Sequence, residues 1–382
     1  MGMEFSRRAF VRAAAGVAAV GLCACGANGE GDQGAVGEQN VNVVVVEEKD
    51  VEPATEDLPK LAFFDLHADT VDTLCMHEYE PYASSSDEKF DGTLAENNAA
   101  VSASRMGDVG WAQCYAIWTP DDCPTVSHRE FYEHGAEFFR QQLKECADAI
   151  AGVREPGDID EALAAGKVAA ILTVENSCMI EEKKDLELVD EFEEDGVLVC
   201  GLTWNGTNAL AGGVSTNDGL SSLGKTYIRA LEKSKMIVDV SHLSDESFWD
   251  VEKAAKRPYI ATHSNARAVC NIPRNLTDDQ FKAIRDRGGL VGLNLCTWFV
   301  HSEDRDYEVE DLLAHVEHWL DLGGEDVVAF GTDRDGSGMP DWIRDCSRQE
   351  KLYKKIAKHL DEEITHKLFY QNAHDFFERD LA

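Results

Sequence analysis

Residues 61–69 read Leu-Ala-Phe-Phe-Asp-Leu-His-Ala-Asp. Residues 61–66 form a short, mostly apolar run of the kind that a buried β-strand requires. His67 and Asp69 follow two residues apart, so an extended backbone would point both side chains to the same face. An imidazole and a carboxylate on one face can together bind a divalent metal ion. This stretch therefore predicts a buried strand that ends at a metal site.

Short β-branched or apolar runs of the same kind recur along the chain, and amphipathic stretches separate most of them. We expect strands at residues 61–66, 110–118, 168–174, 197–203, 236–241, 259–262, 290–295 and 327–331. We expect helices at residues 131–151, 244–255, 277–287 and 309–322. Buried strands that alternate with helices in this way predict an α/β fold, a (β/α)8 barrel. A doubly wound open sheet is the alternative, but no Gly-rich phosphate-binding turn follows the first strand.

Polar side chains stand at the ends of most of the expected strands. Beyond the first strand, they include Glu175, His242, His263 and Asp333. In a barrel of parallel strands the carboxyl ends meet at one rim, where the chemistry of such folds takes place. One such end is usually a hydrogen-bonded core residue, because an unpaired polar group is costly to bury. Several of them at one rim indicate a shared site.

The nitrogen and oxygen donors at this rim suit a divalent metal ion. The candidate ligands are His67, Asp69, Glu175, His242 and His263. This set exceeds a single tetrahedral zinc site and fits two metal ions that share a bridging carboxylate. A hydroxide held between two such ions is nucleophilic near neutral pH and can attack a peptide carbonyl. The rim therefore predicts a metal-dependent hydrolase.

Acidic residues outnumber basic ones, with 72 Asp and Glu against 36 Lys and Arg, and the formal net charge is −36. Nucleic acids and anionic membrane surfaces would repel such a chain, so neither is an expected partner. The 11 cysteines are too sparse for a small disulfide scaffold and too scattered for a zinc ribbon. No apolar run approaches the ~20 residues of a membrane-spanning helix. This composition is typical of an acidic, soluble α/β protein.

Residues 1–25 have the pattern of an export signal. Arg7 and Arg8 precede an apolar stretch at residues 13–22 that is too short to span a bilayer. Paired arginines before a weakly apolar segment resemble a twin-arginine signal peptide. The Leu-Cys-Ala-Cys sequence that ends at Cys25 resembles a lipobox, in which Cys25 would carry the lipid. An ordinary cleaved signal peptide is the alternative.

Two further segments complete the expected domain organisation. Residues 26–59 are rich in Gly, Asn, Glu and Val, and we expect them to be a flexible acidic tether. Residues 60–382 would form the catalytic barrel domain. The predicted location is the extracytoplasmic face of a bacterial membrane, with membrane contact only through the lipid anchor at Cys25.

The motifs at the rim resemble those of the membrane (renal-type) dipeptidase family, the M19 metallopeptidases. The resemblance covers about residues 60–380. His67-Ala68-Asp69 matches the first motif of the family, and Glu175 stands in its bridging-glutamate position. His242 and His263 match its two later histidine motifs.

This resemblance implies a zinc-dependent dipeptidase with two zinc ions in a (β/α)8 barrel. His67, Asp69 and Glu175 would hold one ion. His242 and His263 would hold the other together with Glu175. Members of the family hydrolyse dipeptides with free ends and tolerate a D-residue at the C-terminal position. The resemblance leaves open whether the protein is a homodimer.

Two more residues take roles from the resemblance. Arg274, eleven residues after His263, matches the arginine that grips the carboxylate of the substrate. Asp333 lies in a Gly-Thr-Asp-Arg-Asp-Gly segment and matches the aspartate that transfers protons. Asp335 is the competing candidate for that role, because it stands only two residues further on.

Trp204 departs from the family pattern. Several members carry at this point a histidine that is thought to help polarise the scissile carbonyl. An indole can only donate a hydrogen bond and carries no charge. We expect Trp204 and Asn205 to contact the substrate, and the zinc ions, Asn205 or Asn208 to polarise the carbonyl.

Two other functions stay open at this point. A binuclear hydrolase of the amidohydrolase type would act on N-acyl amino acids or lactones, but such enzymes usually open with His-x-His where this chain has His67-Ala68-Asp69. A surface lipoprotein could keep the barrel and bind peptides without cutting them. Trp204 is the only feature that favours the lipoprotein, and unused metal ligands would be costly to bury.

Overall fold

The apolar run after Leu61 forms β1 (Ala62–Ala68), and every residue of this strand is buried. In the computed structural model, which describes residues 61–77, 79 and 90–381, β1 pairs in parallel with β2 (Gly110–Trp118) and with β8 (Val328–Phe330). The predicted signal peptide, the tether and Cys25 lie outside the described residues. Because β1 has a strand on each side, it lies within the sheet and not at an edge.

Parallel pairing extends from β1 in both directions, in the order β6-β5-β4-β2-β1-β8-β7. The other strands of this series are β4 (Val168–Glu175), β5 (Val197–Gly201), β6 (Ile237–Asp239) and β7 (Val291–Leu293). Residues 259–262 were predicted to be a strand, and they form two single parallel bridges instead. Asp239 pairs with Ile260 and Ala261 pairs with Val291, so this segment joins β6 to β7. The predicted α/β barrel is confirmed.

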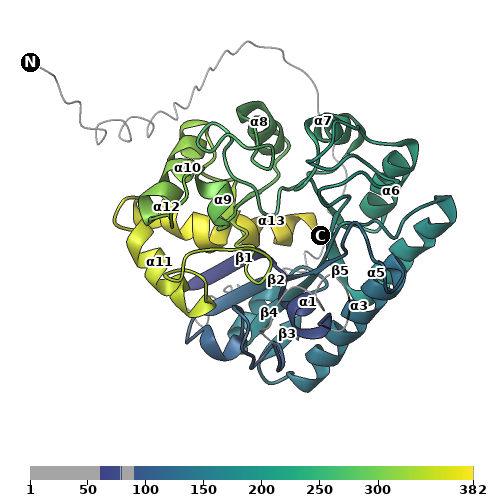
Figure 1. Ribbon diagram of the computed structural model, residues 1–382. Coiled ribbons are helices and arrows are strands. Elements are labelled where there is room, and N and C mark those ends of the chain that lie inside the picture. Colours follow the sequence, from purple (N-terminus) through teal and green to yellow (C-terminus); the bar gives the residue numbers. More distant parts are fainter. Residues whose placement is uncertain (1–60, 78, 80–89, 382) are drawn as a thin grey trace, which may run out of the picture. The chain divides into compact units, whose positions relative to one another are not determined.

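Helices follow most of the strands and surround them (Figure 1). They are α1 (Thr70–Cys75), α3 (His128–Glu145), α4 (Asp158–Ala164), α5 (Leu188–Asp195), α6 (Ser222–Lys233), α7 (Asp245–Ala254), α8 (Asp278–Asp286), α9 (Thr297–Val300), α10 (Val309–Asp321), α11 (Gln349–Ile356), α12 (Glu362–His366) and α13 (Asn372–Asp380). Short 3-10 turns lie at Ala103–Arg105, Lys183–Glu187 and Cys346–Arg348, and a π turn lies at Lys367–Gln371. None of the described helices has both the length and the apolar character needed to cross a bilayer.

The predicted helix at residues 131–151 is displaced towards the N-terminus. Helix α3 begins after Ser127, whose side chain and that of Glu130 form a capping box that satisfies free N–H groups of the first turn. The helix ends at Glu145, and residues 150–152 form a short strand, β3 (Ile150–Gly152). This strand pairs with the first residues of β4, which supplies the backbone hydrogen bonds that a longer helix would have made. The predictions for α7, α8 and α10 are confirmed to within one residue at each end.

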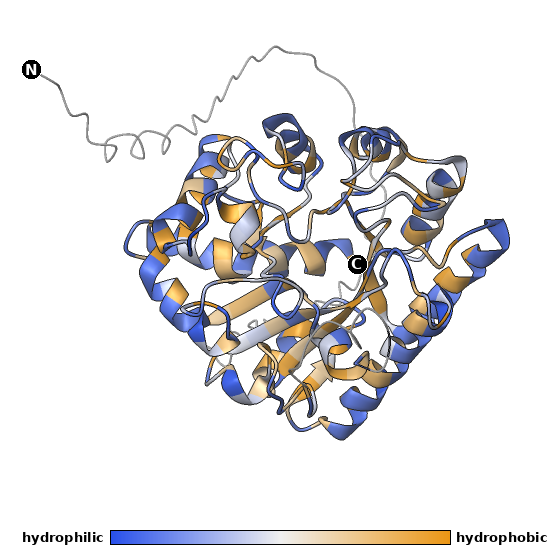
Figure 2. Cartoon of the chain, in the orientation of Figure 1, coloured by the Kyte–Doolittle hydropathy of each residue, from blue (hydrophilic) through white to orange (hydrophobic). Residues whose placement is uncertain are grey.

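The core lies on both faces of the strands. Phe63 packs in one buried cluster, whereas Ala62, Phe64 and Leu66 pack in another, as the alternation of side chains along a strand requires. Figure 2 shows the central strands largely in the colours of hydrophobic residues and the surrounding helices with hydrophilic residues on their outer sides. This packing holds the carboxyl ends of the strands in place, and the polar residues predicted from the sequence lie at those ends.

Candidate metal centre and active site

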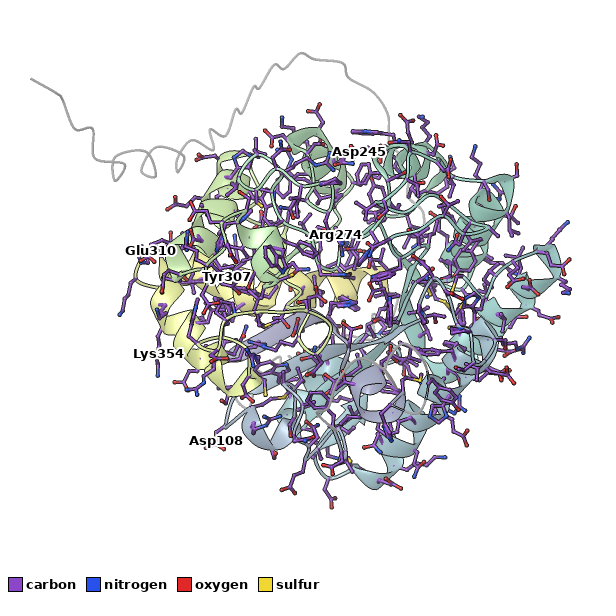
Figure 3. All side chains as sticks on the ribbon, viewed as in Figure 1. Asp108, Asp245, Arg274, Tyr307, Glu310 and Lys354 are labelled. Carbon is purple, nitrogen blue, oxygen red and sulfur yellow. The ribbon has the colours of Figure 1, made fainter. Side chains whose placement is uncertain are left out.

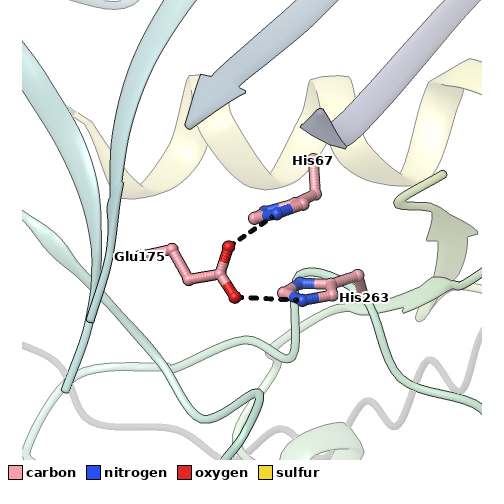
Figure 4. Close-up of side chains that lie close together, drawn as sticks. All are labelled: His67, Glu175 and His263. Carbon is pink, nitrogen blue, oxygen red and sulfur yellow. Dashed lines mark ion pairs between the residues drawn. The ribbon is translucent and has the colours of Figure 1, made fainter. Parts of the chain in front are cut away.

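Glu175, the last residue of β4, lies at the centre of a group of buried histidines. Its Oε2 atom lies 3.0 Å from His67 Nε2, and its Oε1 atom lies 2.7 Å from His242 Nε2 and 3.8 Å from His263 Nε2. Figure 4 shows the carboxylate beside the rings of His67 and His263, with one oxygen towards each. The carboxylate therefore turns one oxygen towards His67 and the other towards the two later histidines.

His67 and Asp69 meet at the end of β1, although they do not share one strand. The register of β1 against β2 shifts between Asp65 and Ala68, and Asp69 stands at the N-cap of α1. Nevertheless, His67 Nε2 lies 3.5 Å from Asp69 Oδ2. The expected convergence is therefore present, but a strand irregularity and a helix start produce it in place of simple strand alternation.

The two later histidines present the same ring nitrogen to the centre. His242 Nδ1 lies 3.0 Å from Asn205 Oδ1, an oxygen that can only accept, and this contact favours a protonated Nδ1. His263 Nδ1 lies 2.7 Å from Thr262 Oγ1, which itself donates to Asp239 Oδ2 at 2.5 Å, so this contact favours a protonated Nδ1 as well. In these tautomers both Nε2 atoms offer a lone pair to the centre, where they lie 3.0 Å apart. Two lone pairs at this distance indicate a position for a cation.

The buried carboxylates of the centre also indicate a position for a cation. Burial raises the pKa of Asp69 to about 7, His67 opposes this rise, and the carboxylates of Glu175 and Asp333 add to it. Burial also raises the pKa of Asp333. For Glu175, burial alone would raise the pKa, but His67 and His242 lower it below its ordinary value. A bound dication would favour the charged form of all three carboxylates.

The residues at the rim fit a metal ion. Their donor atoms form two sets in which all atoms lie within 4.8 Å of one another, His67 with Glu175 and His263, and His67 with Asp69 and Asp333. Among these buried atoms, Asp69 Oδ1 has no hydrogen-bond partner, and His67 Nε2 contacts the carboxylates of Glu175 and Asp69 at 3.0 and 3.5 Å. An unpaired buried polar atom is costly, and a metal ion among these donors would satisfy it.

Two of the candidate site residues hold unusual backbone conformations. His242 has a φ of 66° and Asp333 has a φ of 62°, in the left-handed region that non-glycine residues rarely adopt. Hydrogen bonds hold both in place, because Val214 N donates to His242 O at 2.7 Å and Asp333 N donates to His67 O at 3.0 Å. Such conformations cost about 1–3 kcal/mol each and gather at functional sites.

Asp333 and Asp335 have different surroundings. Asp333 lines the cavity described below, and its Oδ2 atom accepts a hydrogen bond from Asn294 Nδ2 at 2.9 Å. Both oxygens of Asp335 already accept hydrogen bonds, from Thr70 Oγ1 at 2.6 Å and from the backbone N–H of Ala100 at 2.6 Å. Asp335 therefore anchors neighbouring segments, whereas only Oδ2 of Asp333 is engaged by Asn294.

Arg274 is a buried cation with unused donors. Its side chain is largely enclosed, with 7% of the residue exposed. Nη1 donates to Ser264 Oγ at 3.0 Å, but Nε and Nη2 have no hydrogen-bond partner. The guanidinium lies over the ring of Phe299, 5.5 Å from its centre. Figure 3 shows Arg274 near the middle of the view, well inside the peripheral Glu310 and Lys354. A planar cation of this kind suits a carboxylate from outside the chain.

A cavity of about 450 Å³ opens beside these residues, within the size range of small-molecule sites. Its acidic and imidazole lining includes Asp69, Glu175, His242, Asp333 and Asp335, and its aromatic lining consists of Trp118, Trp204, Trp298 and Phe299. Arg274 is not itself a lining residue, but Phe299, on which it packs, is.

Trp204 and Asn205 both line this cavity. The Trp204 ring packs edge-on against Trp118, with ring centres 5.0 Å apart. Asn205 fixes the orientation of His242 through the contact at Nδ1. Asn208 ties its loop to the end of β4, because its amide nitrogen donates to Leu202 O at 2.7 Å and to Asn176 Oδ1 at 3.1 Å, and its oxygen accepts from two backbone N–H groups. These contacts use both N–H groups of the Asn208 side chain.

The sequence did not point to two kinds of site residue. Asn294 contacts Asp333 and stands in a stretch that was predicted only as a strand. A polar residue near the end of an apolar run was the available signal. Trp298 and Phe299 line the cavity from the short helix α9, and no spacing pattern marks them.

Comparisons with known proteins agree on one family. Residues 55–379 match the family model described as membrane dipeptidase, peptidase family M19. A relative from Klebsiella pneumoniae, the uncharacterized protein in the pqqA 5' region, is 36% identical over 203 residues, which cover 50% of this chain and 74% of the relative.

Solved structures resemble the chain over most of its length. The structure of dipeptidase AC, a metallopeptidase of family M19, is 25% identical with a TM-score of 0.72, and the match covers 84% of this chain and 98% of that one. A metallopeptidase from Rhodobacter sphaeroides, liganded with a phosphinate mimic of the dipeptide L-Ala-D-Ala, is 24% identical with a TM-score of 0.73. That match covers 84% of this chain and 99% of the other, and it shows a shared fold.

Proposed function

Because the chain belongs to the membrane dipeptidase family (peptidase family M19), we propose that it is a zinc-dependent dipeptidase that hydrolyses the peptide bond of dipeptides with free termini. One observation carries the proposal: the Nε2 atoms of His242 and His263 face each other at 3.0 Å beside the Glu175 carboxylate, as ligands of one cation would. The adjoining cavity of about 450 Å³ has room for a substrate as small as a dipeptide.

Two zinc ions would be held around Glu175. His67, Asp69 and Glu175 would bind one ion, and His242 and His263 would bind the other together with Glu175. The support for a bridging role is that Glu175 offers Oε2 to His67 and Oε1 to the other two histidines. When bound, the zinc ions polarise the scissile carbonyl and make a water molecule nucleophilic near neutral pH.

Proton transfer is assigned to Asp333. Asn294 occupies Oδ2, so Oδ1 is the oxygen left to take a proton. Burial raises the pKa of Asp333, which brings it closer to the range in which a carboxyl group can both accept and release a proton. Asp333 would accept a proton from the attacking water at Oδ1 and deliver it to the nitrogen of the leaving amino acid.

Substrate binding is assigned to Arg274, whose Nε and Nη2 donors have no partner in the chain. They would hold the C-terminal carboxylate of the substrate by two parallel hydrogen bonds. Because this carboxylate lies one residue beyond the scissile bond, a longer peptide would place an uncharged amide there. This contact therefore explains a preference for dipeptides.

Trp204 and Asn205 would shape the site around the substrate. Trp204 would line the pocket with Trp118, and Asn205 would both face the substrate and keep the Nε2 atom of His242 free for a metal. Trp204 cannot replace a charged histidine, so polarisation of the carbonyl falls to the zinc ions in this proposal.

Export is part of the proposal and rests on the sequence. Arg7 and Arg8 before a short apolar stretch suit a twin-arginine signal, and Cys25 suits a lipid anchor. Metabolic labelling with a fatty acid tests the anchor, since wild-type chain would carry the label and a C25A variant would not. Label on both variants, or on neither, would contradict lipidation at Cys25.

The test of the activity is hydrolysis by the zinc-loaded protein. The panel contains dipeptides with free ends, including one with a C-terminal D-residue, together with N-acetylated and C-amidated versions, N-acyl amino acids and lactones. We expect release of amino acids from the free dipeptides only, loss of this activity with a chelator, and recovery with zinc. Cleavage restricted to N-acyl amino acids or lactones, or no cleavage at all, would overturn the proposal.

A further inference from the structure

Trp298 is an exposed indole that lines the cavity. It lies in α9, and 59% of its surface is exposed. Within the described residues, Val269 at 38% is the only other large hydrophobic side chain with comparable exposure. A single exposed hydrophobic side chain is ordinary on a protein surface. Trp298 differs because its exposed ring borders the cavity that holds the candidate metal ligands.

The start of α9 is tied to the proposed proton-transfer residue. Cys296 N donates to Asn294 Oδ1 at 2.6 Å. The amide nitrogen of the same Asn294 donates to Asp333 Oδ2 at 2.9 Å. One side chain therefore fixes both Asp333 and the beginning of the helix, so Trp298 stands on a backbone whose position relative to the reaction centre is set.

The other end of α9 is tied to the proposed carboxylate site. Phe299, the residue after Trp298, lies under the Arg274 guanidinium, and its ring centre is 5.5 Å from the guanidinium carbon. Its backbone oxygen accepts a hydrogen bond from Asn275 Nδ2 at 2.9 Å, and Asn275 follows Arg274 directly. Trp298 is therefore the lining residue next to the one on which Arg274 packs.

We propose that Trp298 binds the side chain of the substrate's C-terminal residue and favours dipeptides in which that side chain is large and apolar. This inference rests on the proposed function. In any amino acid the carboxylate carbon is bonded to Cα, so a carboxylate held by Arg274 brings the C-terminal side chain next to α9. Contact with the indole would remove apolar surface of both groups from water.

The aromatic character of this part of the wall narrows the substrate class further. Trp298 and Phe299 both line the cavity, and Arg274 is engaged by the main-chain carboxylate in this scheme. An acidic C-terminal side chain would lose water against the indole without gaining an apolar contact. The favoured C-terminal residues are thus leucine, phenylalanine and similar residues, and aspartate or glutamate would be poor.

The test compares four zinc-loaded proteins: wild type, W298A, W298F and the control V269A, whose residue is exposed but does not line the cavity. The substrates are Gly-Phe, Gly-Leu, Gly-Gly and Gly-Asp. We expect W298A to lower kcat/KM for Gly-Phe and Gly-Leu about tenfold, or about 1.4 kcal/mol, mainly through a higher KM. For Gly-Gly we expect less than a twofold change. W298F should retain most of the preference, and V269A all of it.

The outcomes separate this inference from the activity on which it rests. If wild type cleaves the dipeptides but W298A keeps the wild-type ratio of Gly-Phe to Gly-Gly, the inference is wrong and the dipeptidase proposal stands. An equal fall in kcat on both substrates would also overturn it, because it would show a structural role. A change in oligomeric state or vesicle binding in W298A, with the ratio unchanged, would assign the indole to another partner. No cleavage by wild type would remove the proposed function and the inference together.

Discussion

Replacing Glu175 with glutamine perturbs the proposed centre most directly, because the change removes one negative charge and almost no volume. The carboxylate oxygens lie 2.7 to 3.8 Å from the three imidazole Nε2 atoms, so a cation held among these donors would lie within about 4 Å of the charge. At that distance a carboxylate and a dication attract each other by about 8 kcal/mol at an effective dielectric constant of about 20. The neutral amide is less costly to bury, which offsets part of this loss, and about 1.4 kcal/mol is a factor of ten, so we expect E175Q to bind metal at least about a thousandfold more weakly.

The assay for E175Q is metal content after dialysis against a zinc buffer, followed by dipeptide hydrolysis. We expect two zinc ions per chain in wild type, at most one in E175Q, and activity reduced at least a thousandfold in the variant. E137Q is the matched control, because Glu137 is an exposed residue of α3. E175Q that keeps two zinc ions and activity within tenfold of wild type would refute the bridging role.

Three further predictions concern single residues. D333N should lower kcat by about 10²–10⁴ and leave KM and folding nearly unchanged, whereas D335N should mainly lower the melting temperature; similar losses of kcat in both would contradict the assignment of proton transfer. R274M should raise KM for free dipeptides by at least about tenfold and should leave the weak competitive inhibition by a C-amidated dipeptide nearly unchanged, and an equal effect on both would show that Arg274 does not bind the carboxylate. His315 accepts from Ala266 N and lies 2.8 Å from Val300 O, and burial lowers its pKa to about 4. Between about pH 6.5 and 4 the His315 side chain takes up a proton in the unfolded chain but not in the folded chain. The free energy of unfolding therefore falls by about 3 kcal/mol as the pH drops from about 6.5 to 4. In urea unfolding at a series of pH values, the free energy of unfolding of H315Q should fall less with decreasing pH than that of wild type. The same pH dependence in both proteins would exclude this contribution of His315.

The placement of the candidate ligands could be predicted because it depends on a general feature of parallel barrels. Residues that follow buried strands meet at one rim, whatever their separation along the chain. Glu175 ends β4 and His242 follows β6, so the predicted strand ends were enough to place both residues at the same rim. The same reasoning could not foresee that Asp69 stands at a helix N-cap, because the shift in register within β1 depends on its neighbours.

Other features depend on contacts that no local pattern contains. Asp333 and Asp335 look alike in the sequence, and both have a positive φ, yet only one keeps a free oxygen at the cavity. Residues 259–262 are apolar enough for a strand, but they pair with each of the neighbouring strands, β6 and β7, through only one bridge. The position of Trp298 depends on tertiary contacts of α9, which joins the surroundings of Asp333 to those of Arg274.

The proposed pair of metal ions can be tested directly by X-ray diffraction from crystals of the zinc-loaded protein at the zinc absorption edge. Two anomalous peaks are predicted, one on the Oε2 side of Glu175 near His67 and Asp69, and one on the Oε1 side near His242 and His263. A single peak, or peaks that avoid the Glu175 carboxylate, would contradict a centre built from two bridged ions.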